Sequence, residues 1–255
     1  MTPAELIYAV KQGRMFDLIS DNLAGRSMTM EEFIVMLNYL SAYWQYPGEA
    51  RAEVPHALLK AGGHSNGFIA CMEILRYPGL CKLFANEIIK KIISFGEFEI
   101  GIVDVVVSSA YSAIGIGWEV ASGIRPYNHK VEYITAEKDK NGNPTIIRGK
   151  IDSGKTVLVV NELMTTIDGS TWETKQAVRE CNGEGKPPKI IDPSFVFVNR
   201  SNSSVLTDGS RVVGLFNFDM TDYDLKKETC PYCEKGSQAM RPKEGTNWKT
   251  YFMNS

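Results

Sequence analysis

Hydrophobic positions recur at helical spacing in the first third of the chain. Thr2-Pro3 with Glu5, and Thr29 with Glu32, are typical of helix starts, because the hydroxyl and the glutamate cap free backbone N–H groups. Apolar stripes predict a helix over 31–44, which includes Trp44, and another over 78–95. Residues 1–50 are therefore expected to form a helical portion packed on the main body.

Beyond residue 101 the pattern changes to short apolar runs that alternate with amphipathic segments. The runs predict strands over 102–107, 131–135, 145–148, 156–161, 195–198 and 211–218. The segments between them predict helices over 110–121 and 169–181. Such alternation favours an α/β fold with a largely parallel sheet flanked by helices.

Composition narrows the possible partners. The 255 residues are 44% hydrophobic and 23% charged, with a net charge of -2, so neither a nucleic-acid nor a membrane partner is expected. No apolar run approaches the roughly 20 residues of a membrane span. Five cysteines indicate reduced thiols, and a cytoplasmic protein is expected because no signal pattern begins the chain.

The segment 156–171 carries the most chemistry. An apolar strand ends at Glu162, and a hydroxyl-rich turn then leads into a helix. Ligands collect at the carboxyl edge of such sheets, and a helix N-terminus attracts phosphate through its free N–H groups. A carboxylate beside a phosphate cradle suits a ribose phosphate.

This segment resembles the ribose-phosphate loop of the phosphoribosyltransferases, which has two acidic residues and then Thr-Thr-Gly-Gly-Ser or Thr. Here the acidic pair is Asn161-Glu162, and Gly-Gly is replaced by Ile167-Asp168-Gly169, which makes the loop one residue longer. The resemblance implies that Glu162, with Asn161, binds the ribose hydroxyls. It implies that the 5′-phosphate lies on the turn residues Thr165, Thr166, Asp168, Gly169, Ser170 and Thr171.

Four further segments arrive in the order typical of orotate phosphoribosyltransferases. Residues 59–69, a glycine-rich segment expected between helices, resemble the segment beside the base, with Lys60 on pyrophosphate and Phe68 as a wall of the base site. The strand-to-helix turn at 106–114 resembles the pyrophosphate turn, and its contacts are Ser109, Ala110 and Tyr111. The charged loop at 136–144 resembles the mobile catalytic loop, with Lys138 and Lys140 on the departing pyrophosphate. Arg200 matches an arginine that binds the pyrimidine edge.

Two other patterns have plain explanations. Residues 149–156 match the phosphate-loop formula, but a strand follows where that loop needs a helix, so a nucleotide triphosphatase is not expected. Cys230-Pro231-Tyr232-Cys233 has the spacing of half a zinc site, but Cys71, Cys81 and Cys181 supply no second pair. The pair is interpreted as a tail found in some members of the family, and no metal-ligating residue is predicted, although metal binding by Cys230 and Cys233 stays open as the less favoured alternative.

The resemblance as a whole implies a phosphoribosyltransferase-type fold and pyrimidine nucleotide synthesis from phosphoribosyl pyrophosphate and orotate. Glu162, Lys138 and Lys140 are the predicted catalytic residues, magnesium the predicted cofactor, and a homodimer the predicted assembly. The expected organisation is a helical portion over 1–50, the transferase domain over 51–229 and a cysteine-containing tail over 230–255. A transferase for another base, or a non-catalytic binding protein on the same fold, stays open because the loop and the serine-rich turn depart from the family pattern.

Overall fold

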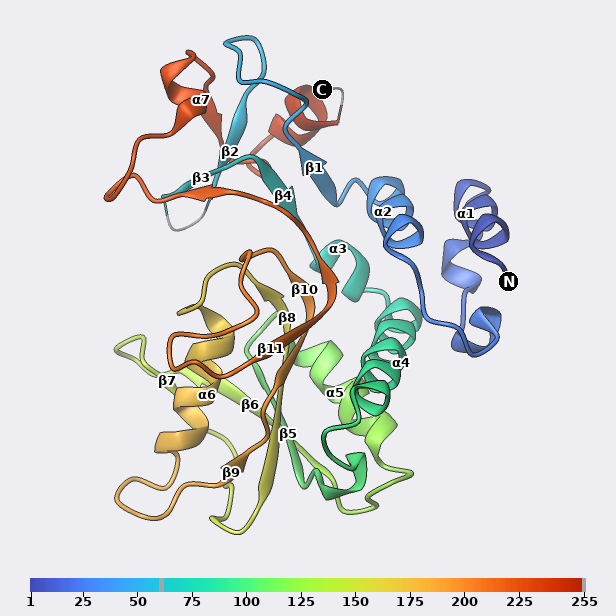
Figure 1. Ribbon diagram of the computed structural model, residues 1–255, viewed down its shortest axis with the longest axis vertical. Helices are drawn as coiled ribbons and strands as arrows, with labels where there is room; N and C mark the ends of the chain where they lie inside the picture. Colours follow the sequence, from blue (N-terminus) through green and yellow to red (C-terminus); the bar gives the residue numbers. More distant parts are fainter. Residues whose placement is uncertain (60–61, 254–255) are drawn as a thin grey trace.

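The protein is described by a computed structural model that covers residues 1–59 and 62–253. Its centre is a seven-stranded sheet in the order β11-β10-β8-β5-β6-β7, with β9 beside β8 (Figure 1). All of the pairs are parallel except β6 with β7. The strands of this sheet are β5 (Val105–Ser109), β6 (Glu132–Lys138), β7 (Pro144–Thr145), β8 (Thr156–Met164), β9 (Lys189–Ile190), β10 (Ser194–Asn199) and β11 (Val212–Asn217).

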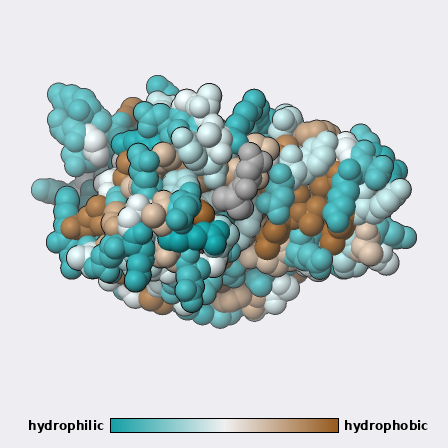
Figure 2. Space-filling model, turned by 90° about the horizontal axis from the view of Figure 1, so that it is seen from above, coloured by the Kyte–Doolittle hydropathy of each residue, from teal (hydrophilic) through white to brown (hydrophobic). Residues whose placement is uncertain are grey.

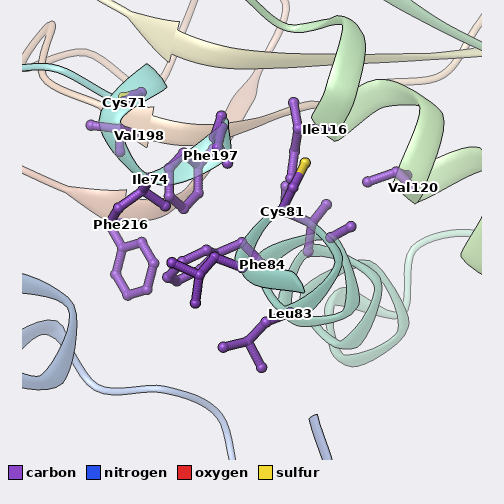
Figure 3. Close-up of a cluster of buried hydrophobic side chains, with 14 of the residues drawn as sticks. Cys71, Ile74, Cys81, Leu83, Phe84, Ile116, Val120, Phe197, Val198 and Phe216 are labelled. Carbon is purple, nitrogen blue, oxygen red and sulfur yellow. The ribbon is translucent and has the colours of Figure 1, made fainter. Parts of the chain in front are cut away.

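Helices cover both faces of this sheet, as the alternating pattern predicts. Figure 1 shows α4 (Pro78–Phe95) and α5 (Ile114–Ile124) on one face and α6 (Ser170–Glu180) on the other. The helix predicted over 78–95 is confirmed, because its expected stripe is buried. That stripe packs against sheet residues such as Phe197 and Phe216 in the main core (Figure 3).

The chain order of the parallel strands creates a topological switch point between β5 and β8. From β5 the chain crosses through α5 to β6 on one side, and later it returns to β8 on the other side of β5. Connections that leave neighbouring strands in opposite directions open a crevice at the carboxyl ends of those strands. The β5–α5 turn and the β8–α6 turn both lie at this crevice.

The N-terminal helices belong to the main core. Helices α1 (Pro3–Lys11) and α2 (Met30–Tyr39) both begin with the predicted capping boxes, and two 3₁₀ turns lie between them. The predicted extension of the second helix to Trp44 is wrong. The helix stops because Ser41 takes a positive φ of 53°, and Trp44 then lies in strand β1 (Tyr43–Gln45).

A smaller lobe above the sheet joins distant parts of the chain (Figure 1). It contains a four-stranded sheet in the order β12-β3-β2-β13 and the two-stranded pair β1-β4. The described part of the segment 59–69, which was predicted to lie between helices, therefore forms strands instead, with a tight turn before β4 (Gly67–Ile69). The elements of this lobe are β2 (His56–Leu58), β3 (His64–Ser65), β4 (Gly67–Ile69), β12 (Asp222–Tyr223), α7 (Pro231–Glu234), β13 (Ala239–Met240) and a final π-helical turn (Trp248–Phe252), and the short helix α3 (Met72–Leu75) leads from it to α4.

Several element boundaries differ from the prediction. Strand β5 starts at Val105 rather than residue 102, because Ile100–Ile102 forms a 3₁₀ turn. Helix α5 starts four residues later than predicted, and only Pro144–Thr145 of the region around 145–148 forms a strand. Residues 149–155 lead into a strand and not a helix, as expected, so they lack the helix of a phosphate loop.

The surface is largely hydrophilic in the view from above, with small hydrophobic groups (Figure 2). Several large apolar side chains are exposed on the N-terminal helical portion, among them Tyr8 and Ile19. Among the described residues no helix is both long and apolar enough to cross a bilayer.

The integration of α2 into the core can be tested at Phe33. Its ring is fully buried and lies 5.4 Å from the ring of Phe84, 5.2 Å from that of Phe197 and 3.9 Å from that of Phe216. Phe33→Ala is therefore expected to lower the free energy of unfolding by about 3–5 kcal/mol in urea denaturation, as a single transition. Phe16→Ala, at a ring that is 45% exposed, is the control and should cost much less. Equal losses in the two variants would show that α2 is not part of the core.

Candidate active site

A buried amide holds the two turns of the switch point together. Asn161 Oδ1 accepts the backbone N–H of Ser109 at 2.8 Å, at the end of the neighbouring strand β5. Its Nδ2 lies 3.4 Å from Thr171 Oγ1 and 3.3 Å from Thr174 Oγ1, both on α6. The side chains of Asn161 and Thr171 are therefore enclosed. Both face into the protein in this structure, and the predicted contacts of these two residues with substrate stay a prediction.

Glu162 points to the opposite side, since successive side chains of a strand alternate. Its Oε1 accepts a hydrogen bond from the Ser112 hydroxyl, and the Cys71 thiol lies 3.8 Å from its backbone oxygen. Its Oε2 is buried and has no hydrogen-bond partner within the described residues. Burial raises the pKa of Glu162, while the bond from Ser112 opposes that shift. A buried acceptor without a partner is costly, which is typical of a site that awaits a donor such as a sugar hydroxyl.

The β8–α6 turn forms an open loop at a helix N-terminus. Thr166, Ile167 and Asp168 are exposed, and Gly169 is the cap of α6. A Cβ at Gly169 would lie 2.8 Å from Thr166 Oγ1, so a larger residue there would require the Thr166 side chain to move. The carbonyl of Ile167 accepts both the backbone N–H and the hydroxyl of Thr207 at 3.2 Å. The additional residue of this loop is thus anchored to the segment between β10 and β11.

The β5–α5 turn offers free backbone donors. The N–H of Ser109 is used by Asn161, and the N–H of Ala110 donates to the carbonyl of Ala136 at 2.8 Å. The Ala110–Tyr111 peptide is cis, and Tyr111 is highly exposed. The next N–H groups have no partner within the described chain, and they belong to Tyr111, Ser112 and Ala113. Consecutive free N–H groups make a concavity that suits an anion.

A charged hairpin forms the remaining wall. Strand β6 continues to Lys138, further than predicted, and returns through a turn capped by Asp139. Lys138 Nζ lies 3.0 Å from Glu173 Oε1 on α6, and Lys140 is exposed in the turn. A cavity of about 230 Å³ lies between these parts, lined by residues of the β5 turn, the hairpin and α6 that include Ser109, Ala110, Lys138, Ser170 and Glu173.

Two residues predicted at the base site, Arg200 and Phe68, contact other parts of the protein. Arg200 is buried, and its Nη2 donates to Asp222 and, at 2.9 Å, to Ser65 Oγ. Its Nη1 donates to the Gly67 carbonyl at 3.3 Å, and its Nε has no partner within the described residues, so the predicted contact with a base stays a prediction. Phe68 packs in the small lobe against Trp248, with the ring centroids 5.8 Å apart. Lys60 lies outside the described residues.

A second polar cluster lies in the small lobe. It contains His56, His64, Cys230 and Cys233, whose ligand atoms all lie within 4.8 Å of one another. Burial, with a smaller contribution from His64, lowers the pKa of His56 to about 4. The histidines were not predicted as partners of the two cysteines, because the fold, and not sequence proximity, brings the four residues together. In the sequence, the only signal of this cluster was the short separation of His56 and His64, which a hairpin can bring together.

Comparison with known proteins identifies the family. No family model matches the chain. The orotate phosphoribosyltransferase of Campylobacter hominis is 30% identical over 195 residues, which are 73% of this chain and 90% of that relative. That of Caldicellulosiruptor bescii is 28% identical over 188 residues, or 73% of this chain and 87% of the relative. The chain belongs to the orotate phosphoribosyltransferase family.

A solved structure supports the same fold. Leishmania donovani UMP synthase has a TM-score of 0.50 and 15% identity, and the match covers 74% of this chain and 38% of that one. At this identity the likeness concerns the fold alone. The predicted phosphoribosyltransferase-type α/β fold is confirmed, and so is the family resemblance drawn from the ribose-phosphate loop.

The burial of the Glu162 carboxylate, whose Oε2 lacks a partner among the described residues, has a consequence for stability. Because its native pKa is raised, its protonated form favours the fold, and this contribution is fully present below the unfolded pKa of about 4.3 and is lost as pH rises through the native value. Glu162→Gln cannot ionise. We therefore expect the melting temperature of the variant to exceed that of the wild type increasingly as pH rises from about 4 towards 7.

The matched control for this comparison is Glu184→Gln, at an exposed position. Its difference from the wild type should stay nearly constant with pH. If the melting temperature of Glu162→Gln falls relative to that of the wild type as pH rises, the carboxylate is better stabilised in the fold than in the unfolded chain.

Proposed function

We propose that this protein transfers the phosphoribosyl group of phosphoribosyl pyrophosphate to orotate and releases pyrophosphate. Membership of the orotate phosphoribosyltransferase family supports the reaction and the base. The observation that supports the site is the convergence of three features at one switch point. These are the partnerless Oε2 of Glu162, the open N-terminus of α6 and the free N–H groups after β5.

The chemistry asks for positioning and charge stabilisation. The bond from the anomeric carbon to the pyrophosphate oxygen breaks, and a bond from that carbon to a ring nitrogen of orotate forms. The ribose gains positive character and the leaving group gains negative charge. Fixed dipoles and charges aimed at these positions lower the barrier without covalent participation of the protein.

Each part of the crevice suits one part of the substrate. Glu162 would accept hydrogen bonds from the ribose hydroxyls through the oxygen that lacks a partner. The 5′-phosphate would lie on the α6 turn, where Thr165, Thr166, Gly169 and Ser170 offer hydroxyls and N–H groups. The pyrophosphate would lie on the N–H groups of the β5 turn, with Lys138 and Lys140 reaching it from the hairpin. Lys138 would first have to leave Glu173.

Magnesium fits this arrangement as a partner of the substrate. The crevice offers one buried carboxylate oxygen without a partner, and magnesium commonly binds through one or two carboxylates with substrate phosphates and water. Because that oxygen is the one assigned to the ribose hydroxyls, the ion would be held mainly by the substrate phosphates and water. When bound, the ion neutralises charge on the pyrophosphate. A homodimer stays a prediction, to be checked by light scattering.

The proposal predicts activity with orotate, phosphoribosyl pyrophosphate and magnesium. Wild-type protein should consume orotate, followed by its ultraviolet absorbance, with matching pyrophosphate release. Glu162→Gln should lower kcat/KM by about 10- to 100-fold, since hydrogen bonds to a charged group contribute about 1.5–3 kcal/mol. Glu184→Gln should leave it unchanged.

A panel of orotate, uracil, adenine and hypoxanthine separates the alternatives. Pyrophosphate release with one of the other bases but not with orotate would reassign the base. If the protein binds phosphoribosyl pyrophosphate but releases no pyrophosphate with any of these bases, a non-catalytic binding protein is favoured.

The acidic loop residue yields a separate prediction. Asp168 is exposed in the turn that would hold the 5′-phosphate, so its charge should repel the ligand. Asp168→Asn is expected to tighten binding of phosphoribosyl pyrophosphate a few-fold in calorimetry, because one repulsive pair near a protein surface is worth about 1 kcal/mol or more. Asp152→Asn, exposed before β8, is the charge-matched control. Weaker binding in the Asp168 variant would mean that this carboxylate contributes to the site through another partner.

A further inference from the structure

The cluster in the small lobe has the composition of a closed metal site. His56 comes from β2 and His64 from β3, while Cys230 and Cys233 come from the start and the body of α7. Two imidazole nitrogens and two thiols, within 4.8 Å of one another, supply four ligand atoms. Zinc in structural sites is bound tetrahedrally by such sets of cysteine and histidine.

Three nitrogen-to-sulfur distances in the cluster are close to the edges of a zinc tetrahedron. With bonds of about 2.0–2.1 Å to nitrogen and 2.3 Å to sulfur, the edges should measure about 3.3 Å between nitrogens and about 3.5 Å between nitrogen and sulfur. His56 Nε2 lies 3.6 Å from the Sγ of Cys230 and 3.6 Å from that of Cys233. His64 Nδ1 lies 3.3 Å from Cys233 Sγ and 2.9 Å from His56 Nε2.

A hydrogen-bond chain behind His56 orients its ring as a ligand. The Ser237 hydroxyl donates to the Val54 carbonyl at 2.6 Å. Ser237 Oγ, 2.8 Å from His56 Nδ1, must then accept the proton of that nitrogen. The unprotonated Nε2 is thereby directed at the two sulfur atoms. Outer partners of this kind fix the tautomer of histidine ligands at metal sites.

The position of the cluster explains what an ion would stabilise. The hydrophobic core of the small lobe is a small cluster of buried residues, namely Trp44, Tyr46, Val54, Ala57, Trp248 and Phe252. Small cores are commonly reinforced by a metal or disulfides. The four ligands join the β2-β3 hairpin to a segment more than 160 residues later in the chain, so one ion would close a long loop.

We propose that His56, His64, Cys230 and Cys233 together bind one structural zinc ion. All four tetrahedral positions are filled by the protein, so the ion has no open position for a substrate. The site is separate from the phosphoribosyl crevice. It acts on that crevice only through the lobe, because β3 pairs with β12, whose Asp222 holds Arg200.

A disulfide between Cys230 and Cys233 is the main alternative for the cysteine pair. It would account for the two sulfur atoms but not for the two histidines directed at them or for the bond from Ser237. The chemistry distinguishes the two, because zinc holds both sulfurs as thiolates that a chelator releases, while a disulfide has no free thiol.

Metal analysis of the full chain, purified with reductant and without chelator, tests the site. We expect about one zinc per chain, released by a mercurial reagent. Cys233→Ser and His56→Ala should each lose most of this metal. Cys181→Ser and His129→Ala are the matched controls, since neither side chain belongs to the cluster, and both should keep the full content.

Cobalt titration of the metal-free wild-type chain provides a second measurement that does not depend on the folding of a variant. Binding at the site should produce thiolate-to-cobalt charge transfer and the intense visible bands of tetrahedral cobalt, with saturation at one equivalent, and zinc should displace the cobalt. A chain that purifies without zinc and gives no such bands would overturn the proposal. A Cys230–Cys233 disulfide that persists with zinc and reductant, or metal content unchanged in Cys233→Ser, would overturn it as well.

Discussion

The arrangement of the crevice depends on the buried amide of Asn161. Its oxygen binds the end of β5 and its nitrogen lies against the start of α6, so one side chain links the β5–α5 turn to the β8–α6 turn. An amide can accept and donate at once, whereas a carboxylate at the same place would only accept. The family pattern has an acidic residue here, and the polar contacts explain how asparagine can replace it without opening the sheet.

With Asn161 turned inwards, strand alternation directs Glu162 outwards into the crevice. The fold thus supplies one enclosed polar group that joins its elements and one partly satisfied group that, in the proposed function, would bind the ligand. The partnerless oxygen of Glu162 is unfavourable in the free protein, and a ribose hydroxyl would remove that cost. Stability and substrate binding are therefore opposed at this residue, which is common where a site is prepared before its ligand arrives.

Local patterns predicted the parts of the fold that local physics determines. The capping boxes of α1 and α2, the stripe of α4 and the apolar runs of β8 and β10 act within a few residues, and their elements form as expected. The strands of the small lobe were missed because they are two or three residues long and are stabilised by pairing with distant segments. Trp44 was assigned to a helix because its spacing continued the stripe, while the helix end depends on the backbone of Ser41.

Side-chain direction was the harder part of the site to predict. The order of motifs predicts a crevice at these turns, but motif order does not say that Thr171 faces inwards or that Arg200 has an acidic partner 22 residues later. That ion pair has a structural consequence. Arg200 follows β10 in the main sheet and Asp222 lies in β12 of the small lobe, so the residue that the family pattern places at the base also joins the two lobes. A base that competed for this guanidinium would loosen the contact between the lobes, and binding of the base would then be coupled to their relative position.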